Sequence, residues 1–189
     1  MAKRPIITIA GSQGSGKSST AKLIAKELGY RHFSSGDLFR EIAKERDLSI
    51  EAINLTAEDQ KEIDYMVDER LRSMKDEEGL VIDSRLAFHW MPESFKVYLS
   101  LDPDTAAERI YNHIMTEGRT SQTAQSVAEA REKINVRVAS ERKRYFDLYG
   151  LDPTDPKHFN LVIDTKTNDL PSVVSSVITP YKSWLSEKS

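Results

Sequence analysis

The chain has 189 residues, of which 39% are hydrophobic and 30% charged, and its formal net charge at pH 7 is −3. This length and this balance are typical of one globular domain with a buried core. A net negative charge disfavours a general nucleic-acid-binding surface, because phosphate backbones attract basic faces. The chain has no cysteine, which excludes disulfides and thiolate metal sites and is typical of a reducing compartment.

No stretch of the sequence reaches the ~20 apolar residues that a membrane span needs. The run IITIA near the N-terminus is too short for the core of a signal peptide, and it leads straight into a glycine-rich stretch. We therefore expect a cytoplasmic protein that has neither a membrane nor nucleic acid as a partner.

Short apolar runs follow one another along the chain, separated by helix-like segments. The runs at 6–10, 80–83, 96–101 and 161–164 predict buried strands, and a weaker run lies at 31–35. Strands that alternate with helices are typical of a parallel sheet covered on both faces. The sequence therefore predicts a three-layer α/β fold.

Two helical segments are clear in the sequence. Apolar residues recur at helical spacing over 17–28, and Gly29 is a natural stop for that helix. Apolar residues over 174–184 also share a helical face. Pro180 should kink or break this last helix, because proline lacks the N–H that the helix needs.

The stretch GSQGSGKS, residues 11–18, stands between the first predicted strand and the first predicted helix. It fits G-x-x-x-x-G-K-[ST], in which glycines let backbone N–H groups wrap a phosphate, Lys17 adds a cation and Ser18 offers a hydroxyl to Mg²⁺. A flexible loop can match this pattern by chance, but the strand and helix around it favour a phosphate site. The predicted ATP-binding residues of this loop are Gly11, Ser12, Gln13, Gly14, Ser15, Gly16, Lys17, Ser18 and Ser19.

Asp83 ends the strand predicted at 80–83. Ligands of sheets wound in this way bind at the carboxyl ends of the strands. Asp83 is therefore predicted to hold Mg²⁺ together with Ser18, the alternative being an ordinary strand-end aspartate. The chain has no N-K-x-D stretch, the usual guanine reader, so ATP is favoured over GTP as the co-substrate.

Two arginines follow predicted strands. Arg40 lies in SSGDLFR after the second strand, and Arg85 lies in DSR after the third. A guanidinium grips phosphate with two hydrogen bonds. Either arginine alone fits an ordinary surface residue, but two of them near one phosphate loop predict a second phosphate group, held to receive the first.

The stretches GSQGSGKS, SSGDLFREIAKERDLS, SERKRYFDLYGLD and LVIDT resemble nucleoside monophosphate kinases, most closely the short archaeal-type cytidylate kinases, from residue 5 to about 165. The resemblance implies a five-stranded parallel sheet of order 2-3-1-4-5 within one kinase domain, residues 1–189. The implied parts are a core at 5–40, 80–110 and 155–189, an acidic helical monophosphate-binding insertion at 41–79, and a lid at 111–145.

The resemblance also implies roles for single residues. Arg109 matches an arginine that packs on the ATP base. The implied monophosphate-binding residues are Ser35, Asp37, Arg40, Arg85, Arg137, Glu141 and Arg144. The residues expected to act in catalysis are Lys17, Arg85, Arg137 and Arg144.

The spacing of three lid residues agrees with these roles. Arg137, Glu141 and Arg144 are spaced i, i+4 and i+7, so one helix face carries all three. In isolation such a stripe is a surface salt-bridge pattern of little energetic weight. Opposite a phosphate loop it predicts a cationic clamp for phosphoryl transfer, which depends on positioning and charge neutralisation. Gly118 is a predicted hinge of this lid.

Three positions depart from the related sequences. Tyr65 stands where they tend to carry an arginine, and His113 stands where they tend to carry another basic residue. Leu86 follows Arg85, where some cytidylate kinases place an aspartate. Tyr65 and Leu86 leave the base and the sugar of the acceptor open, and His113 bears on the strength of phosphate binding.

The sequence therefore predicts a monomeric enzyme that moves the γ-phosphate of Mg·ATP to a nucleoside monophosphate, with CMP or dCMP favoured as the acceptor. Two alternatives stay open. One is a kinase of the same loop type for another monophosphate, such as AMP or UMP, or for a small metabolite. The other is an ATP-dependent switch or binding module, against which the paired arginines argue, because a switch needs no second phosphate site.

Overall fold

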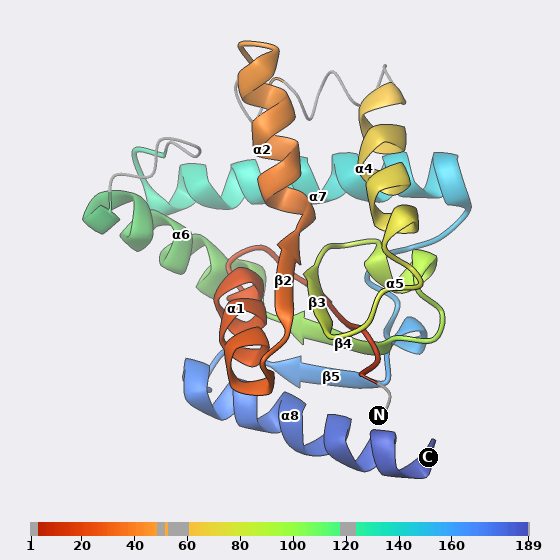
Figure 1. The fold of residues 1–189 in the computed structure, drawn as a ribbon. Coiled ribbons are helices and arrows are strands. Elements are labelled where there is room, and N and C mark those ends of the chain that lie inside the picture. The colour runs from red at the N-terminus through yellow and green to blue at the C-terminus, as the bar shows by residue number, and fades with distance from the viewer. Residues whose placement is uncertain (1–3, 49–51, 53–60, 118–123, 189) are drawn as a thin grey trace.

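A computed structural model describes residues 4–48, 52, 61–117 and 124–188 (Figure 1). One five-stranded sheet has the order β2-β3-β1-β4-β5, and every pair of neighbouring strands is parallel. Helices cover the sheet, which confirms the predicted three-layer α/β fold and the strand order that the resemblance implied. The strands are β1 (Ile7–Gly11), β2 (Arg31–Ser34), β3 (Leu80–Asp83), β4 (Phe95–Ser100) and β5 (Leu161–Asp164).

The helices alternate with the strands along the chain. They are α1 (Lys17–Leu28), α2 (Ser35–Glu45), α4 (Glu62–Ser73), α5 (Ala87–Trp90), α6 (Pro103–Glu117), α7 (Val127–Tyr149) and α8 (Leu170–Glu187), with a short 3₁₀ helix at Pro156–His158. The predicted strands agree with the observed ones to within one residue at each end, and α1 begins and ends where the sequence predicts. None of the described helices is both long and apolar enough to span a membrane.

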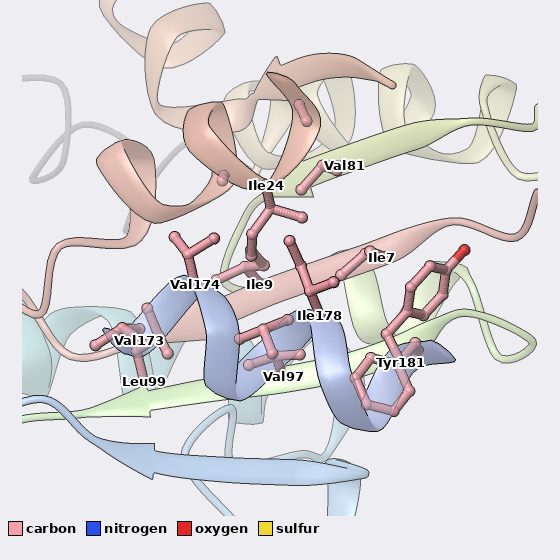
Figure 2. Packing of buried hydrophobic residues seen from close by; sticks show 14 residues of the cluster. Ile7, Ile9, Ile24, Val81, Val97, Leu99, Val173, Val174, Ile178 and Tyr181 are labelled. Carbon is pink, nitrogen blue, oxygen red and sulfur yellow. The ribbon is translucent and has the colours of Figure 1, made fainter. Parts of the chain in front are cut away.

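The main core lies between the sheet and the helices α1 and α8. Figure 2 shows Ile7 and Ile9 of β1 facing Ile24 of α1 and Val174 and Ile178 of α8. These side chains are at most 8% exposed, and burial of each contributes roughly 1.5–3 kcal/mol. This packing fixes β1 against α1, and therefore holds both ends of the loop between them.

The structure does not bear out a break at Pro180, because α8 continues through it from Leu170 to Glu187. A proline inside a helix costs about 3 kcal/mol through one lost hydrogen bond and a steric clash. Five side chains on the core face of α8 are buried, and their combined burial outweighs that cost. The buried residues are Val173, Val174, Val177, Ile178 and Tyr181.

Two parts of the molecule extend the sheet domain. Helices α2 and α4 rise side by side from one end of the sheet and share a small apolar cluster of Ile42, Ala43 and Ile63, and α7 runs across behind them (Figure 1). A further cluster, which includes Ala107 and Ile134, packs α6 against α7. The predicted insertion therefore contains α4, and the predicted lid contains most of α7. The predicted hinge, Gly118, lies outside the described residues.

Candidate active site

The glycine-rich loop between β1 and α1 has a backbone that side chains would not allow. Gly11 lies so close to β4 that a Cβ atom there would overlap the carbonyl oxygen of Leu99. Gly16 precedes α1 with a φ of 84°, in the left-handed region that favours glycine. The loop therefore presents the N-terminus of α1, where backbone N–H groups bind phosphate.

Lys17 extends from the first turn of α1 back across the loop. Its Nζ donates hydrogen bonds to the carbonyl oxygens of Gly11, at 2.9 Å, and Ser12, at 2.8 Å. Burial lowers the pKa of the Lys17 ammonium to about 7, and the charge of Arg85 adds to the effect. A phosphate group beside Lys17 would raise this pKa again, since an opposite charge favours the charged form.

Asp83, at the end of β3, lies beside the first turn of α1. The hydroxyl of Ser18 donates a hydrogen bond to Asp83 Oδ2, and the hydroxyl of Ser34 lies 3.3 Å from the same oxygen. Magnesium that binds with a nucleotide usually takes one or two protein carboxylates and completes its shell with phosphate and water. The oxygens of Ser18 and Asp83 fit that donor set. In the described ranges no group of three or more His, Asp or Glu side chains has the arrangement of a metal site.

A cavity of about 360 Å³ lies over the loop, and we call it the main cavity. Six of the nine predicted loop residues line it: Gln13, Gly14, Gly16, Lys17, Ser18 and Ser19. The other three lie outside the lining. Among them, Ser15 supports the loop, because its hydroxyl donates to the carbonyl oxygen of Ser12 at 2.8 Å.

Four arginines from different elements also line the main cavity. Arg40 comes from α2, Arg85 from the turn after β3, Arg109 from α6 and Arg137 from α7. Together with Lys17 they place positive charge on several sides of one space. Guanidinium groups bind phosphate through paired hydrogen bonds, so this arrangement can hold more than one phosphate group.

Glu141 of α7 links two of these arginines. Its Oε2 lies 2.6 Å from Arg85 Nε, and its Oε1 lies 2.8 Å from Arg137 Nε. Burial would raise the pKa of Glu141, but Arg85 and Arg137 together hold that pKa below its ordinary value. The carboxylate therefore stays charged and fixes both guanidinium groups at the wall of the cavity.

Arg144 lies elsewhere, outside the lining of the main cavity. Its Nε forms an ion pair at 2.8 Å with Oδ2 of Asp64, on α4, and both side chains are about 95% buried. Burial raises the pKa of Asp64 to about 6, although Arg144 opposes the shift. The structure thus places one predicted lid arginine against the predicted insertion. Sequence reasoning did not identify Asp64, and no motif marks it.

The remaining predicted residues lie at the two ends of the main cavity. Ser35 is in the lining, and its hydroxyl lies 3.4 Å from the carbonyl oxygen of Asp83. Asp37 is outside the lining and pairs with Arg40 one turn along α2. At the other end, Arg109 donates to the carbonyl oxygens of Thr165 and Lys166 at 2.8 and 3.0 Å.

Ser34 is a site residue that the sequence reasoning missed. Its hydroxyl lies in the cavity wall, bonds to Asp83 and accepts a hydrogen bond from the backbone N–H of Asp37 at the start of α2. The S-x-x-D spacing of Ser34 and Asp37 is the signature of a helix N-terminus. That signature marks Ser34 as the N-cap of α2, but no local pattern marks its contact with Asp83.

The three positions that depart from the related sequences have different surroundings. His113 lines the main cavity. Leu86 is buried with 4% of its surface exposed, and Tyr65 is 50% exposed on α4. Of the three, His113 is therefore the one next to the loop and its arginines.

Comparison with known proteins identifies the family of the chain. A family model described as an AAA domain matches residues 10–128. The chain is 35% identical over 186 residues to a cytidylate kinase of Methanopyrus kandleri, with 93% of each chain covered. It is 38% identical over 160 residues to a cytidylate kinase of Methanothrix thermoacetophila, with 85% of this chain and 88% of that one covered.

The fold also matches a solved structure with little sequence likeness. Shikimate kinase from Bacteroides thetaiotaomicron superposes with a TM-score of 0.63 at 16% identity, over 94% of this chain and 97% of that one. At this identity the likeness shows the fold alone. The identity and coverage of the archaeal relatives show more, and they confirm the resemblance that the motifs indicated: the chain belongs to the cytidylate kinase family of P-loop kinases.

Proposed function

We propose that this kinase transfers the γ-phosphate of Mg·ATP to a nucleoside monophosphate, with CMP or dCMP as the acceptor. One observation carries the proposal: Arg40, Arg85 and Arg137 converge with the phosphate loop on a single cavity. The loop would bind the phosphates of ATP. The three arginines would bind a second phosphate group, the one that a nucleoside monophosphate carries.

The reaction needs no nucleophile from the protein. An oxygen of the acceptor's phosphate forms a bond to the γ-phosphorus while the bond from that phosphorus to the β–γ bridging oxygen breaks, and ADP leaves with the electron pair. Negative charge stays on the transferred group throughout, so catalysis rests on positioning and charge neutralisation. Lys17, Arg85 and Arg137 line the main cavity and are proposed to supply that charge.

Magnesium would be held by Ser18 and Asp83, whose oxygens face each other at the start of α1. When bound, it supplies positive charge to the β- and γ-phosphates. Asp83 contributes its carboxylate, and Ser34 orients that carboxylate through its own hydrogen bond. Both groups belong to the rigid end of the sheet, which suits a site that must fix the position of ATP.

The roles proposed for the outer residues follow from their contacts. Arg109 is proposed to pack on the ATP base from its fixed place beside the loop after β5. Ser35, Asp37 and Arg40 are proposed to hold the acceptor at the start of α2. Glu141 is proposed to align Arg85 and Arg137. Arg144 would contact phosphate only after it leaves Asp64. We propose that the lid over 111–145 moves relative to the insertion at 41–79, and that this movement brings Arg144 into the site.

The proposal is tested by ADP release from Mg·ATP with AMP, CMP, UMP, GMP, dCMP and dTMP as acceptors. We expect the highest kcat/KM with CMP or dCMP, and a kcat/KM lower by about 10³-fold for Lys17→Ala. A preference for another monophosphate would contradict the proposed acceptor and would implicate Tyr65 and Leu86. Binding of ATP without stimulation by any acceptor would overturn the kinase proposal in favour of a switch. The main cavity is built from one chain, so we propose that the monomer is the active form, and size-exclusion chromatography at assay concentration checks this.

A further inference from the structure

The side chain of Gln13, the third residue of the phosphate loop, is buried, and its amide nitrogen is unpaired within the part of the chain that the structure describes. Only 8% of its surface is exposed, and its amide nitrogen Nε2 has no hydrogen-bond partner among the described residues. Some nine in ten buried polar groups of folded proteins are paired. A buried donor without a partner costs stability, so its presence in a loop that binds phosphate requires a physical reason.

Two carbonyl oxygens of the loop that could accept a hydrogen bond from Gln13 Nε2 already have other donors. The carbonyl oxygen of Gly11 accepts from Lys17, and that of Ser12 accepts from both Lys17 and the hydroxyl of Ser15. The two carbonyl groups that precede Gln13 therefore already accept hydrogen bonds from other side chains of the loop. An acceptor for Nε2 is expected from outside the loop.

The position of Gln13 indicates where that acceptor would come from. Gln13 and Arg85 line both the main cavity and a neighbouring cavity of about 150 Å³. The neighbouring cavity has a mainly apolar wall that includes Leu101 and Ile134. Its carboxylate, Glu141, is already paired with two arginines. The main cavity instead gathers Lys17 and the arginines, and an anionic oxygen held there would lie within the reach of Gln13.

We propose that Gln13 is a catalytic residue, whose side-chain Nε2 donates a hydrogen bond to a non-bridging oxygen of the phosphoryl group during its transfer. This inference rests on the proposed kinase function and adds a side-chain role to a residue otherwise expected to act through its backbone. No proton moves, and the bonds that form and break are those of the transfer itself. Because Gln13 already lines the main cavity, rotation about its side-chain torsions is the movement that would bring Nε2 to the bound phosphoryl group.

The expected effect is larger on the rate than on binding. A donor that is oriented before the reaction stabilises charge that is redistributed in the transition state, and removal of such a donor typically costs 10²–10³ in rate. Gln13 shares this task with Lys17 and the arginines, so we expect a loss in kcat of about 10- to 100-fold. The affinity for ADP should change by less than about threefold, because ADP lacks the transferred group.

Three variants test the proposal. Gln13→Met keeps the length of the side chain and removes the donor, Gln13→Glu keeps the shape and replaces the donor with a carboxylate, and Gln125→Met is the matched control at an exposed glutamine. For each, kcat and KM are measured with the best acceptor of the wild type. The thermal midpoint is measured without ligand, with Mg·ADP, and with Mg·ADP plus aluminium fluoride, which mimics a transferring phosphoryl group and needs no acceptor.

Support requires that Gln13→Met and Gln13→Glu lose kcat and lose the extra stabilisation by aluminium fluoride, while stabilisation by Mg·ADP is kept. The ligand-free midpoint of Gln13→Met should equal or exceed that of the wild type, since an unpaired donor is gone. An unchanged kcat and an unchanged response to aluminium fluoride would overturn the proposal. So would a parallel loss of Mg·ADP binding, which indicates a structural role. A wild type that responds to aluminium fluoride but phosphorylates no monophosphate would count against the proposed acceptor and leave the role of Gln13 standing.

Discussion

The two sides of the main cavity are built in different ways. On the side proposed to bind ATP, called the ATP side, the loop of residues 11–18 is one continuous stretch, held by backbone geometry and by hydrogen bonds within the loop. On the side proposed to bind the acceptor, called the acceptor side, Arg40, Arg85 and Arg137 come from three separate elements and are held by carboxylates. The first side is rigid because its contacts are local and involve backbone atoms. The second side depends on ion pairs: those of Arg40 and Arg137 lie within α2 and α7, and that of Arg85 with Glu141 joins elements far apart in the sequence.

This difference indicates how the work of the enzyme is divided. A fixed site suits ATP, whose phosphates must lie in one place for the reaction. Arginines held by carboxylates can exchange those partners for phosphate, which allows the acceptor side to rearrange when a ligand enters. The predictions below test whether the two sides are as separable as their construction indicates.

The largest effect is expected on the ATP side, from Lys17→Ala. Lys17 lines the cavity and spans the loop, and loss of its charge removes stabilisation of the transferred group. We expect kcat/KM to fall by about 10³-fold. Steady-state assays measure this, with Lys22→Ala, at an exposed lysine of α1, as the control. A loss below tenfold would show that the arginines alone neutralise the charge.

On the acceptor side, Arg85→Ala should lower kcat/KM for the acceptor by about 10²-fold, because a paired phosphate contact is lost. The affinity for ATP, measured by calorimetry, should stay within about threefold of the wild type if the two sides are separate. Arg142→Ala, at an exposed arginine of α7, serves as the control. An equal loss of ATP affinity would mean that Arg85 serves both sides and would break the comparison.

The pair of Asp64 and Arg144 tests the contact between insertion and lid. The pKa of Asp64 is raised to about 6 by burial, so between about pH 4 and 6 the folded state binds more protons than the unfolded state, and stability falls as pH rises. Asp64→Asn mimics the protonated form. At pH 7.5 we expect it to gain up to about 3 kcal/mol, which is what two pKa units represent, because the raised pKa already includes the attraction of Arg144.

Chemical denaturation at pH 7.5 and pH 4 measures this gain, which should vanish at the lower pH. Glu69→Gln, at an exposed position of α4, is the control. A loss of stability at pH 7.5 would show instead that the ion pair with Arg144 outweighs the cost of burying Asp64. The contact between insertion and lid would then be a firm one that ligands must break.

The smallest effect expected is an uptake of protons on the ATP side. The pKa of Lys17 is lowered to about 7, so at pH 8 most of the side chain is neutral, and phosphate beside it restores the charge. Calorimetry in buffers of different ionisation enthalpy should show close to one proton taken up per Mg·ADP at pH 8 and much less at pH 6. No difference between the two pH values, or the same uptake by Lys17→Ala, would contradict this origin.

The sequence predicts the ATP side better than the acceptor side, and the reason is physical. The loop is a local pattern, because its spacing, the strand before it and the helix after it are all contiguous. Strand positions follow from buried apolar runs. The contact of Arg85 with Glu141 joins residues 56 positions apart in the chain, and no local pattern determines which cation a carboxylate meets.

The position of Arg144 and the continuity of α8 through Pro180 also could not be predicted from local sequence patterns, because both depend on packing. The spacing of Arg137, Glu141 and Arg144 places them on one helix face, but the structure places Arg144 against Asp64 and away from the main cavity. Neighbouring positions on one helix can face different elements. The element that Arg144 faces is determined by the packing of α7 against α4. The local preference of Pro180 to end a helix is likewise outweighed by core packing, because α8 continues through it.

Glu141 has a consequence for turnover. A carboxylate that pairs with the Nε atoms of Arg85 and Arg137 would compete with an incoming phosphate for part of the same two guanidinium groups. In the proposed reaction, Glu141 would therefore lower the affinity for the acceptor and pair with both arginines again after phosphoryl transfer. The enzyme would bind its acceptor less tightly and release the diphosphate product faster.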